Sequence, residues 1–202
     1  MTTDCRLRWI ATAALVLLSV ALARTTVRAK PPGSDGNASF PEVSDSWSPD
    51  GRFVVKNVDH PNDPSSPHLI FLTDMQTGRR TQLYSYPRKV DLYWSPASDA
   101  LAINDWDAND DAQCIVLVLA PLRERIDLRE AFLESRRPDR EKKLATDRHD
   151  YDHNYAHLIR WLDANTLLSV FEGHSSDRKR SFQLIYEYKL GESFRLRKRT
   201  IS

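Results

Sequence analysis

The chain has 202 residues, 41% of them hydrophobic and 28% charged, and its formal net charge is +1 at pH 7. This composition is typical of one globular domain or two small ones. The near-neutral charge argues against a nucleic-acid-binding protein, because that class normally presents a basic surface.

The N-terminus has the layout of a secretory signal peptide. Arg6 and Arg8 precede an apolar run over residues 10–23 that is short for a transmembrane helix. Ala21-Leu22-Ala23 has the small-x-small pattern of a cleavage site, and Val27-Arg28-Ala29 is a second candidate. We therefore predict a signal peptide over residues 1–29 and a periplasmic or extracellular protein that is not integral to the membrane after cleavage. An uncleaved membrane anchor is the alternative.

The mature chain then keeps a single cysteine. Cys5 lies before the apolar run, so only Cys114 remains after cleavage and no internal disulfide can form. Cys114 begins an apolar stretch over residues 114–119, which indicates a buried, inert thiol. Residues 30–40 are rich in Pro, Gly, Ser and Asp, and we predict a linker there.

Residues 41–87 are predicted to form a four-stranded meander. Trp47 ends a first strand, and Ser48-Pro49-Asp50-Gly51 has turn chemistry: Pro fixes φ, Asp bonds the backbone ahead and Gly accepts positive φ. Three more strands are expected at residues 52–57, 68–72 and 79–84.

The tryptophan-led turn returns twice along the chain. Trp94-Ser95-Pro96 marks a second repeat over residues 88–120, and Trp161-Leu162-Asp163 marks a third over residues 153–202. The strands expected in these repeats cover residues 89–94, 101–103, 114–119, 156–161, 167–171, 182–189 and 193–199.

An insertion over residues 121–152 separates the second and third repeats. Asp127 and Glu130 have the spacing of a capping box, and Pro138 ends the helical pattern that follows. This predicts one short helix that replaces the outer strand of the second sheet. The charge run over residues 136–143 is expected to be a solvated loop, with a partner-docking arm as the alternative.

On these residues the chain resembles the TolB-type (WD40-like) β-propeller repeat. In that repeat a Trp-Ser-Pro-Asp-Gly turn and an apolar strand precede an Ile-Tyr-x-x-Asp strand and a Thr-Gly turn. The first repeat matches with Ile70-Phe71-Leu72-Thr73-Asp74 and Thr77-Gly78. The later repeats are degenerate: they keep Trp94-Ser95-Pro96 followed by Ala97-Ser98, and then Trp161, Asp163-Ala164-Asn165, Ile185-Tyr186 and Gly191. The resemblance implies propeller sheets and an exported location, and it implies no activity.

Three repeats are fewer than a closed propeller needs, because propellers usually have four to eight blades. The predicted fold is therefore all-β, with consecutive antiparallel β-meander sheets that resemble an incomplete propeller of about three blades and with one short helical insertion. We favour an open three-sheet arrangement, and self-association through exposed sheet edges is a further possibility.

The second repeat carries alternating oxygen-bearing residues, as a calcium loop does: Asp105, Asp107, Asn109 and Asp111. The sixth position of such a loop is Asp110 instead of Gly, and the twelfth is Val116 instead of Glu. The resembled repeat also has an acidic hairpin here. We therefore favour a polar turn, with a weak ion site as the alternative.

A second polar cluster runs from Asp147 to His157 and includes three histidines: His149, His153 and His157. On a helix these histidines share one face and have the spacing of zinc ligands. The repeat requires a loop that leads into a strand, so we expect polar loop residues more than a metal site.

The sequence has no nucleophile elbow, P-loop or dinucleotide-binding glycine pattern, and no catalytic residue or cofactor is predicted. We expect an exported β-repeat protein that acts by contact and binds a protein partner or a cell-envelope component. The alternative is a small hydrolase or lyase that uses the Asp147–His157 cluster, with or without a metal.

Overall fold

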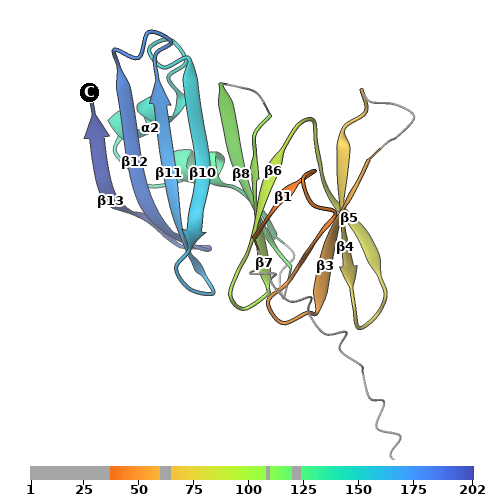
Figure 1. Ribbon diagram of the computed structural model, residues 1–202. Coiled ribbons are helices and arrows are strands. Elements are labelled where there is room, and N and C mark those ends of the chain that lie inside the picture. The colour runs from red at the N-terminus through yellow and green to blue at the C-terminus, as the bar shows by residue number, and fades with distance from the viewer. Residues whose placement is uncertain (1–36, 60–64, 108–109, 120–123) are drawn as a thin grey trace, which may run out of the picture.

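The computed structural model describes residues 37–59, 65–107, 110–119 and 124–202 (Figure 1). The predicted signal peptide, both cleavage candidates, Cys5 and Asn109 lie outside the described residues. Within the described part of the chain, no helix is long and apolar enough to cross a membrane. The fold is all-β apart from two short helices, and its strands form consecutive antiparallel meanders.

The first sheet is the four-stranded meander expected for residues 41–87. Its strands pair in chain order: β2 (Asp45–Trp47), β3 (Phe53–Val58), β4 (His68–Asp74) and β5 (Arg80–Tyr86). The turn after Trp47 has the expected chemistry. Gly51 has a φ of 73°, and the Ser48 hydroxyl accepts a hydrogen bond from the Phe53 amide at 3.0 Å.

The second sheet contains the three strands expected after residue 88: β6 (Val90–Trp94), β7 (Ala100–Asp105) and β8 (Asp111–Val118). In its tryptophan-led turn, Ser98 takes the position of Gly51, with a φ of 65°. The Ser98 hydroxyl accepts a hydrogen bond from the Asp50 amide at 3.0 Å. The turns of the first two sheets are therefore joined directly.

Two short strands extend the second sheet beyond the prediction. β1 (Asn37–Phe40) pairs with β6, so the predicted linker over residues 30–40 is wrong for its last four residues. Phe40 is fully buried between the first and second sheets, a long-range contact that the polar composition of the segment did not indicate. β9 (Glu124–Asp127) pairs with β8, so the outer position holds a short strand that was expected to be a helix.

The third sheet has the four strands expected over residues 153–202: β10 (His153–Trp161), β11 (Thr166–His174), β12 (Ser181–Lys189) and β13 (Ser193–Ile201). The start of β10 also pairs in parallel with the start of β8, where Asn154 is opposite Asp111. This pairing joins the second and third sheets, so the described strands form one four-stranded and one nine-stranded hydrogen-bonded sheet.

The insertion forms two helices. α1 (Leu128–Glu134) is the expected helix, and the Asp127 carboxylate caps it by accepting hydrogen bonds from the amides of Arg129 and Glu130. The charge run, expected to be a loop, belongs largely to α2 (Asp139–Thr146). Pro138 precedes this second helix, and the helix buries Glu141 and Ala145 on the third sheet side of the molecule.

Two hydrophobic cores fill the spaces between consecutive sheets. The first gap, between the first and second sheets, includes Val55, Ile70, Tyr84, Tyr86, Leu92, Trp94, Leu101 and Ile103. The second gap, between the second and third sheets and the helices, includes Ala102, Val116, Leu128, Phe132, Leu158, Phe171, Leu184, Tyr186 and Phe194.

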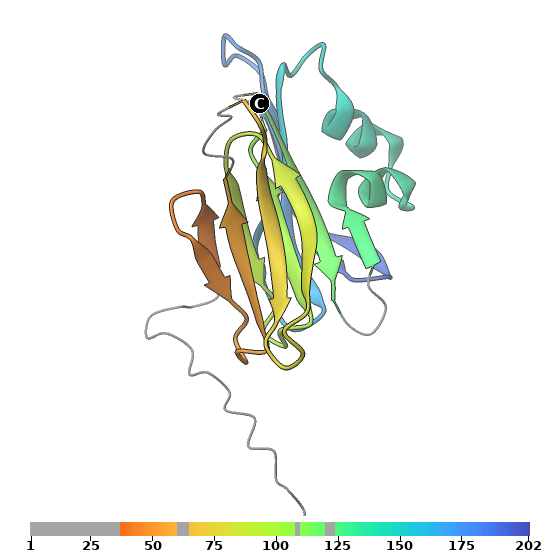
Figure 2. The same cartoon turned by 90° about the vertical axis from the view of Figure 1, so that its right-hand side faces the viewer.

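The middle sheet is thus covered on both faces, which explains why every residue of β7 is buried. Successive residues of β7 point into opposite gaps, with Leu101 and Ile103 in the first and Ala100 and Ala102 in the second. Figure 1 shows the three sheets side by side in chain order, and Figure 2 shows both helices on one side of the molecule, away from β2. The arrangement is an open, incomplete propeller.

Candidate interaction surface

A stack of three sheets has two ends, and each end leaves one sheet face turned away from both cores. The first-sheet outer face carries Trp47, Val54, Lys56, Phe71 and Thr73, which share a face by strand register. The third-sheet outer face carries His153, Tyr155, His157, Val170, Glu172, His174, Gln183, Ile185 and Lys198. These two faces are the surfaces that the fold offers for contact.

The third-sheet outer face is rich in polar groups with defined partners. The Glu172 carboxylate pairs with His157 Nε2 at 3.2 Å and accepts a hydrogen bond from Gln183 Nε2 at 2.8 Å. The hydrogen bond with His157 lowers the pKa of Glu172, against the opposing effect of burial. The face therefore presents a fixed negative charge near neutral pH.

Aromatic and imidazole rings surround this carboxylate. His153 and His174 are opposite each other on neighbouring strands, and their rings stack with centroids 4.4 Å apart. Trp106, which follows β7, lies 5.3 Å from the His157 ring and 6.4 Å from the Tyr155 ring. Large, stiff rings of this kind give much contact area for a small loss of conformational entropy.

A recess of about 470 Å³ opens on the same face. Its lining includes Tyr155, Glu172, His174, Gln183, Lys198 and Thr200. The recess thus combines a carboxylate, an amide, an ammonium group and a hydroxyl with aromatic walls. Such a combination suits a polar side chain or a short segment of another chain.

Arg129 holds β10 in place from the opposite side of the sheet. Its side chain is 17% exposed, and burial lowers its pKa. Nη1 donates to Ala145 O at 2.7 Å and to Asn154 Oδ1 at 3.0 Å, while Nη2 donates to the main-chain oxygens of Ala112 and Asn154, both at 3.1 Å. One guanidinium therefore joins α1, α2, β8 and β10.

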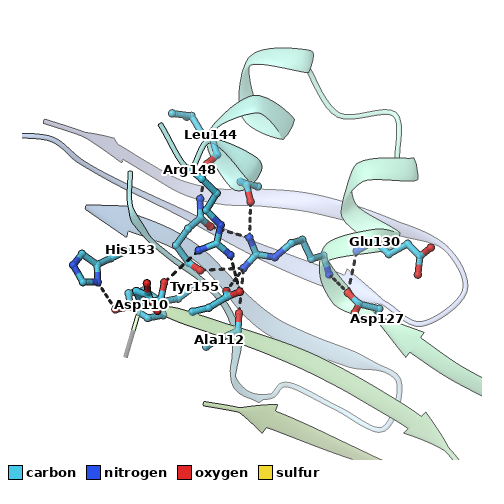
Figure 3. Close-up of polar contacts among 12 residues, drawn as sticks. Asp110, Ala112, Asp127, Glu130, Leu144, Arg148, His153 and Tyr155 are labelled. Atoms are coloured by element: carbon cyan, nitrogen blue, oxygen red, sulfur yellow. Dashed lines mark hydrogen bonds and ion pairs between the residues drawn. The ribbon is translucent and has the colours of Figure 1, made fainter. Parts of the chain in front are cut away.

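The hydrogen bonds to Asn154 fix which residues of β10 point to the third-sheet outer face. Asn154 lies between His153 and Tyr155, so its inward side chain requires the two neighbours to point outward. Its Nδ2 donates to Leu144 O at 3.0 Å, and its main-chain N–H donates to Asp110 O at 3.0 Å. On the outside, the Tyr155 hydroxyl lies 3.4 Å from His153 Nδ1 (Figure 3).

The first-sheet outer face is more apolar. Trp47 and Val54 are opposite each other, 7% and 2% exposed, and neither belongs to the two cores of the described residues. The Arg80 guanidinium lies over the Phe71 ring at 4.1 Å from its centroid.

The structure separates the acidic residues that were considered for an ion site. Asp105 is buried at the end of β7 and accepts a hydrogen bond from the Tyr84 hydroxyl at 2.7 Å, whereas Asp107 is exposed. Asp111 pairs with Arg129 at 3.3 Å and with Arg148 at 2.6 Å. Across the described residues, no three His, Cys, Asp or Glu side chains are placed to hold one metal ion.

The histidine cluster is likewise spread over different environments. His149 lies on an exposed turn, where it pairs with Asp150 at 3.2 Å. His153 and His157 lie four residues apart on β10, and this spacing on a strand is about 13 Å. The helical face that zinc ligation requires is therefore not formed. Asp152 accepts a hydrogen bond from the Ser176 hydroxyl, and Asp150 pairs with Arg180 at 2.5 Å.

Sequence reasoning missed the partners of these histidines. His174 and Glu172 come from β11 and Gln183 from β12, and only strand register brings them beside β10. The available signal was the two-residue alternation of Val170, Glu172 and His174 with core residues. The prediction that Cys114 is buried is confirmed, and burial raises the pKa of its thiol to about 12.

Comparison with known proteins gives fold-level likenesses at low identity. No protein-family model matches the chain. No curated protein matches it either. Among solved structures, the β-propeller domain of the Trilobed protease from Pyrococcus furiosus matches with a TM-score of 0.47 and 13% identity, over 77% of this chain and 43% of that chain.

Two further structures are similar to a comparable extent. TolB from Acinetobacter baumannii matches with a TM-score of 0.38 and 16% identity, over 82% of this chain and 32% of that chain. An acylaminoacyl peptidase from Pyrococcus horikoshii matches with a TM-score of 0.42 and 12% identity, over 75% of this chain and 23% of that chain. The present chain spans less than half the length of each of these proteins.

Proposed function

We propose that this chain is an exported binding module of TolB-type repeats that acts by contact with another protein through the outer faces of its end sheets. One observation carries the proposal. The third-sheet outer face presents ordered rings, a carboxylate and a recess, while both helices and the second sheet pack on the opposite face.

The make-up of this surface supports a protein partner. Protein interfaces favour aromatic side chains at the centre and polar groups that orient the partner. Tyr155 and Trp106 supply the rings, and Glu172 and Gln183 supply hydrogen-bonding groups with fixed positions. A cell-envelope component is the other class of partner that the exported location allows.

The competing hydrolase or lyase finds less support in the geometry. The Asp147 carboxylate accepts hydrogen bonds from the amides of His149 and Asp150, so it serves a local turn. Asp150 and Asp152 are occupied by Arg180 and Ser176. General acid–base catalysis requires such groups to converge on one reacting atom.

Site-specific photo-crosslinking tests the contact function. A benzophenone amino acid replaces Gln183 on the third-sheet outer face, and a control chain carries it at the exposed Thr146 at the end of α2. We expect protein adducts from position 183 in the producing cells and none from position 146. Equal labelling at both positions, or no adduct from either, overturns the proposal.

Export is tested separately by the N-terminal sequence of the protein recovered outside the cytoplasm. We expect the mature chain to begin after Ala23 or Ala29. Recovery with Met1 intact in the cytoplasmic fraction contradicts export.

A further inference from the structure

β13 forms an open edge of the third sheet. It pairs with β12 on one side, and no described strand lies beyond it on the other (Figure 1). β13 has nine residues, whereas the other edge strands of the described chain, β1, β2, β5 and β9, have three to seven. Every residue from Arg197 to Ile201 is exposed. This half of β13 is therefore long and accessible enough to accept a further strand.

The pairing of β13 with β12 shows which main-chain groups face the open side. Ser181 and Ser202 exchange two main-chain hydrogen bonds, both at 2.9 Å. In an antiparallel pair, residues bonded in this way alternate with residues whose N–H and C=O groups turn away from the partner strand. By this alternation, Arg199 and Ile201 direct their main-chain donors and acceptors to the open side. These are the groups that an added strand would bond.

β13 is also strongly basic. Its nine residues include four cations and no carboxylate: Arg195, Arg197, Lys198 and Arg199. All four side chains belong to exposed residues. Glu187 on β12 pairs with Arg197 and also lies opposite Arg195, so one carboxylate serves two cations. Lys198 has no ion pair within the described part of the chain, and its neighbour on β12 is Ile185.

The other carboxylate that acts on this strand is already engaged. Glu141 lies close enough to Arg199 for the two charges to interact, but its carboxylate accepts hydrogen bonds from Arg137 and Tyr186. β13 therefore keeps an excess of positive charge. Charged side chains on an edge strand can prevent unwanted pairing, and the edge strand β5 carries a single cation, Arg80, over seven residues. The four cations of β13 exceed that need and repel one another until an anion approaches.

We propose that β13 is a docking edge for an acidic, extended segment of another protein, which adds to the third sheet as a fifth strand. The main-chain groups of Arg199 and Ile201 bond the added strand, and its carboxylates lie beside Lys198 and the arginines. In this mode of recognition the main chain supplies affinity and alternate side chains supply specificity. The inference goes beyond the proposed contact function, because it uses the edge of the sheet instead of its outer face and names the chemistry of the partner.

Fluorescence anisotropy with a synthetic probe is the first test. The probe is a labelled eight-residue peptide of alternating Glu and Val, added to the purified chain at several salt concentrations. We expect saturable binding that weakens as salt is raised, because the attracting charges are exposed. Absence of binding at low salt overturns the proposal.

A charge-reversed chain locates the binding site. Lys198 and Arg199 are both exposed, so the double variant Lys198→Glu/Arg199→Glu retains the fold. We expect its dissociation constant for the probe to rise by about tenfold or more, since like charges that are brought together oppose binding. Arg79→Glu, an exposed position beside the first sheet, is the matched control and should bind as the parent chain does. Equal binding by the two variants places the peptide elsewhere and overturns the proposal.

A second peptide separates strand addition from attraction between charges alone. It has the same sequence with every main-chain nitrogen methylated, so it keeps the carboxylates but has no N–H group to donate. We expect it to bind about tenfold more weakly or worse. Equal binding of the two peptides contradicts strand addition and favours a polyanion, such as a nucleic acid, as the ligand of β13.

Hydrogen exchange reads the edge directly. The main-chain N–H groups of Arg199 and Ile201 should exchange more slowly when the acidic peptide is bound, while those of β4 in the first sheet stay unchanged. Unchanged exchange at both residues contradicts docking at this edge. If the peptide does not bind but position 183 still gives protein adducts, the contact function stands and only the docking edge is wrong.

Discussion

The two gaps between the sheets are filled in different ways. The first gap is closed by side chains of two sheets and β1, and its core is apolar. The second gap contains two helices and the charged side chains of Arg129 and Glu141. An apolar gap tolerates small changes in shape, whereas buried charges are stable only when every hydrogen bond is made. The comparison indicates that the second gap depends on a few polar residues.

The largest expected effect is the loss of Arg129. Arg129→Met removes a guanidinium that serves four acceptor residues. It leaves three main-chain oxygens short of a donor, whereas Asp111 keeps its ion pair with Arg148. Because each buried acceptor left without a donor costs about 1–3 kcal/mol, we expect a loss of about 3–5 kcal/mol in the free energy of unfolding, measured with urea. Ile103→Val in the first gap is the control and should cost about 0.5–1.5 kcal/mol.

A loss below about 1 kcal/mol for Arg129→Met would contradict the dependence of the second gap on polar residues, because that gap would then be held by apolar packing like the first. Arg129→Lys sharpens the result. Lysine keeps the charge but lacks the planar fork, so we expect an intermediate loss.

Glu141 is the second polar group of that gap. It accepts hydrogen bonds from the Tyr186 hydroxyl at 2.6 Å and from Arg137 Nη2 at 2.9 Å. Burial acts to raise its pKa, but these two bonds and the Arg137 charge outweigh burial and lower the pKa below 4.5. Its stabilising effect is therefore present above pH 4.5 and is lost as the pH falls through the folded-state pKa.

Glu141→Gln should cost about 1.5–3 kcal/mol at pH 7, and the difference from the parent chain should shrink in acid. Melting temperatures between pH 3 and pH 7 measure this. A difference that is constant over that range would show that the charge of Glu141 does not matter.

Asp105, at the margin of the first gap, has a pKa shift of the opposite sign to that of Glu141. Burial raises its pKa despite the hydrogen bond from Tyr84, and among the described residues its Oδ1 has no partner. The ionised carboxylate thus destabilises the folded chain at pH 7, and this penalty fades as the pH falls through the raised pKa.

Asp105→Asn should raise the free energy of unfolding at pH 7 by on the order of 1 kcal/mol, because the amide keeps an acceptor for Tyr84 without the buried charge. The gain should vanish in acid. Destabilisation at pH 7 would mean that the carboxylate has a stabilising partner, and the two gaps would then resemble each other more closely.

A contrast between local chemistry and long-range contacts explains which parts of the fold could be predicted from the sequence. The turns after Trp47, Trp94 and Trp161 and the apolar strands of the middle sheet depend on local chemistry and on burial of both faces, so they were predictable. α2 was missed because Glu141 is buried by Tyr186, 45 residues further along the chain. β1 was missed because its pairing with β6 spans about fifty residues.

Only part of the candidate surface could be predicted from the sequence, for the same reason. His153 and His157 were identified as candidates, but a helical face was considered where the chain forms a strand. The groups that give this face its chemistry, His174 and Glu172, depend on the register of β10 with β11. That register follows from the turn between the two strands and from an irregularity between Leu158 and Arg160, and the residue pattern did not reveal this irregularity.

The smallest expected effects concern two turns with a non-glycine residue at positive φ. The turn that begins at Ser175 repeats the bonds of the Ser48 turn: the Arg180 amide donates to the Ser175 hydroxyl at 3.1 Å, and Arg178 has a φ of 56°. Ser98 has the same conformation, but its hydroxyl also bonds the Asp50 amide across the first gap.

Arg178→Gly should therefore stabilise the chain by up to about 1 kcal/mol, because glycine removes the left-handed strain and the exposed arginine lies outside both cores. Ser98→Gly removes the same strain and also the bond that joins the first two sheets, so we expect a net change between zero and a loss of about 1 kcal/mol. Differences in melting temperature between the two variants measure the turn-to-turn bond. Equal stabilisation by both would show that this bond adds nothing to the stability of the first gap.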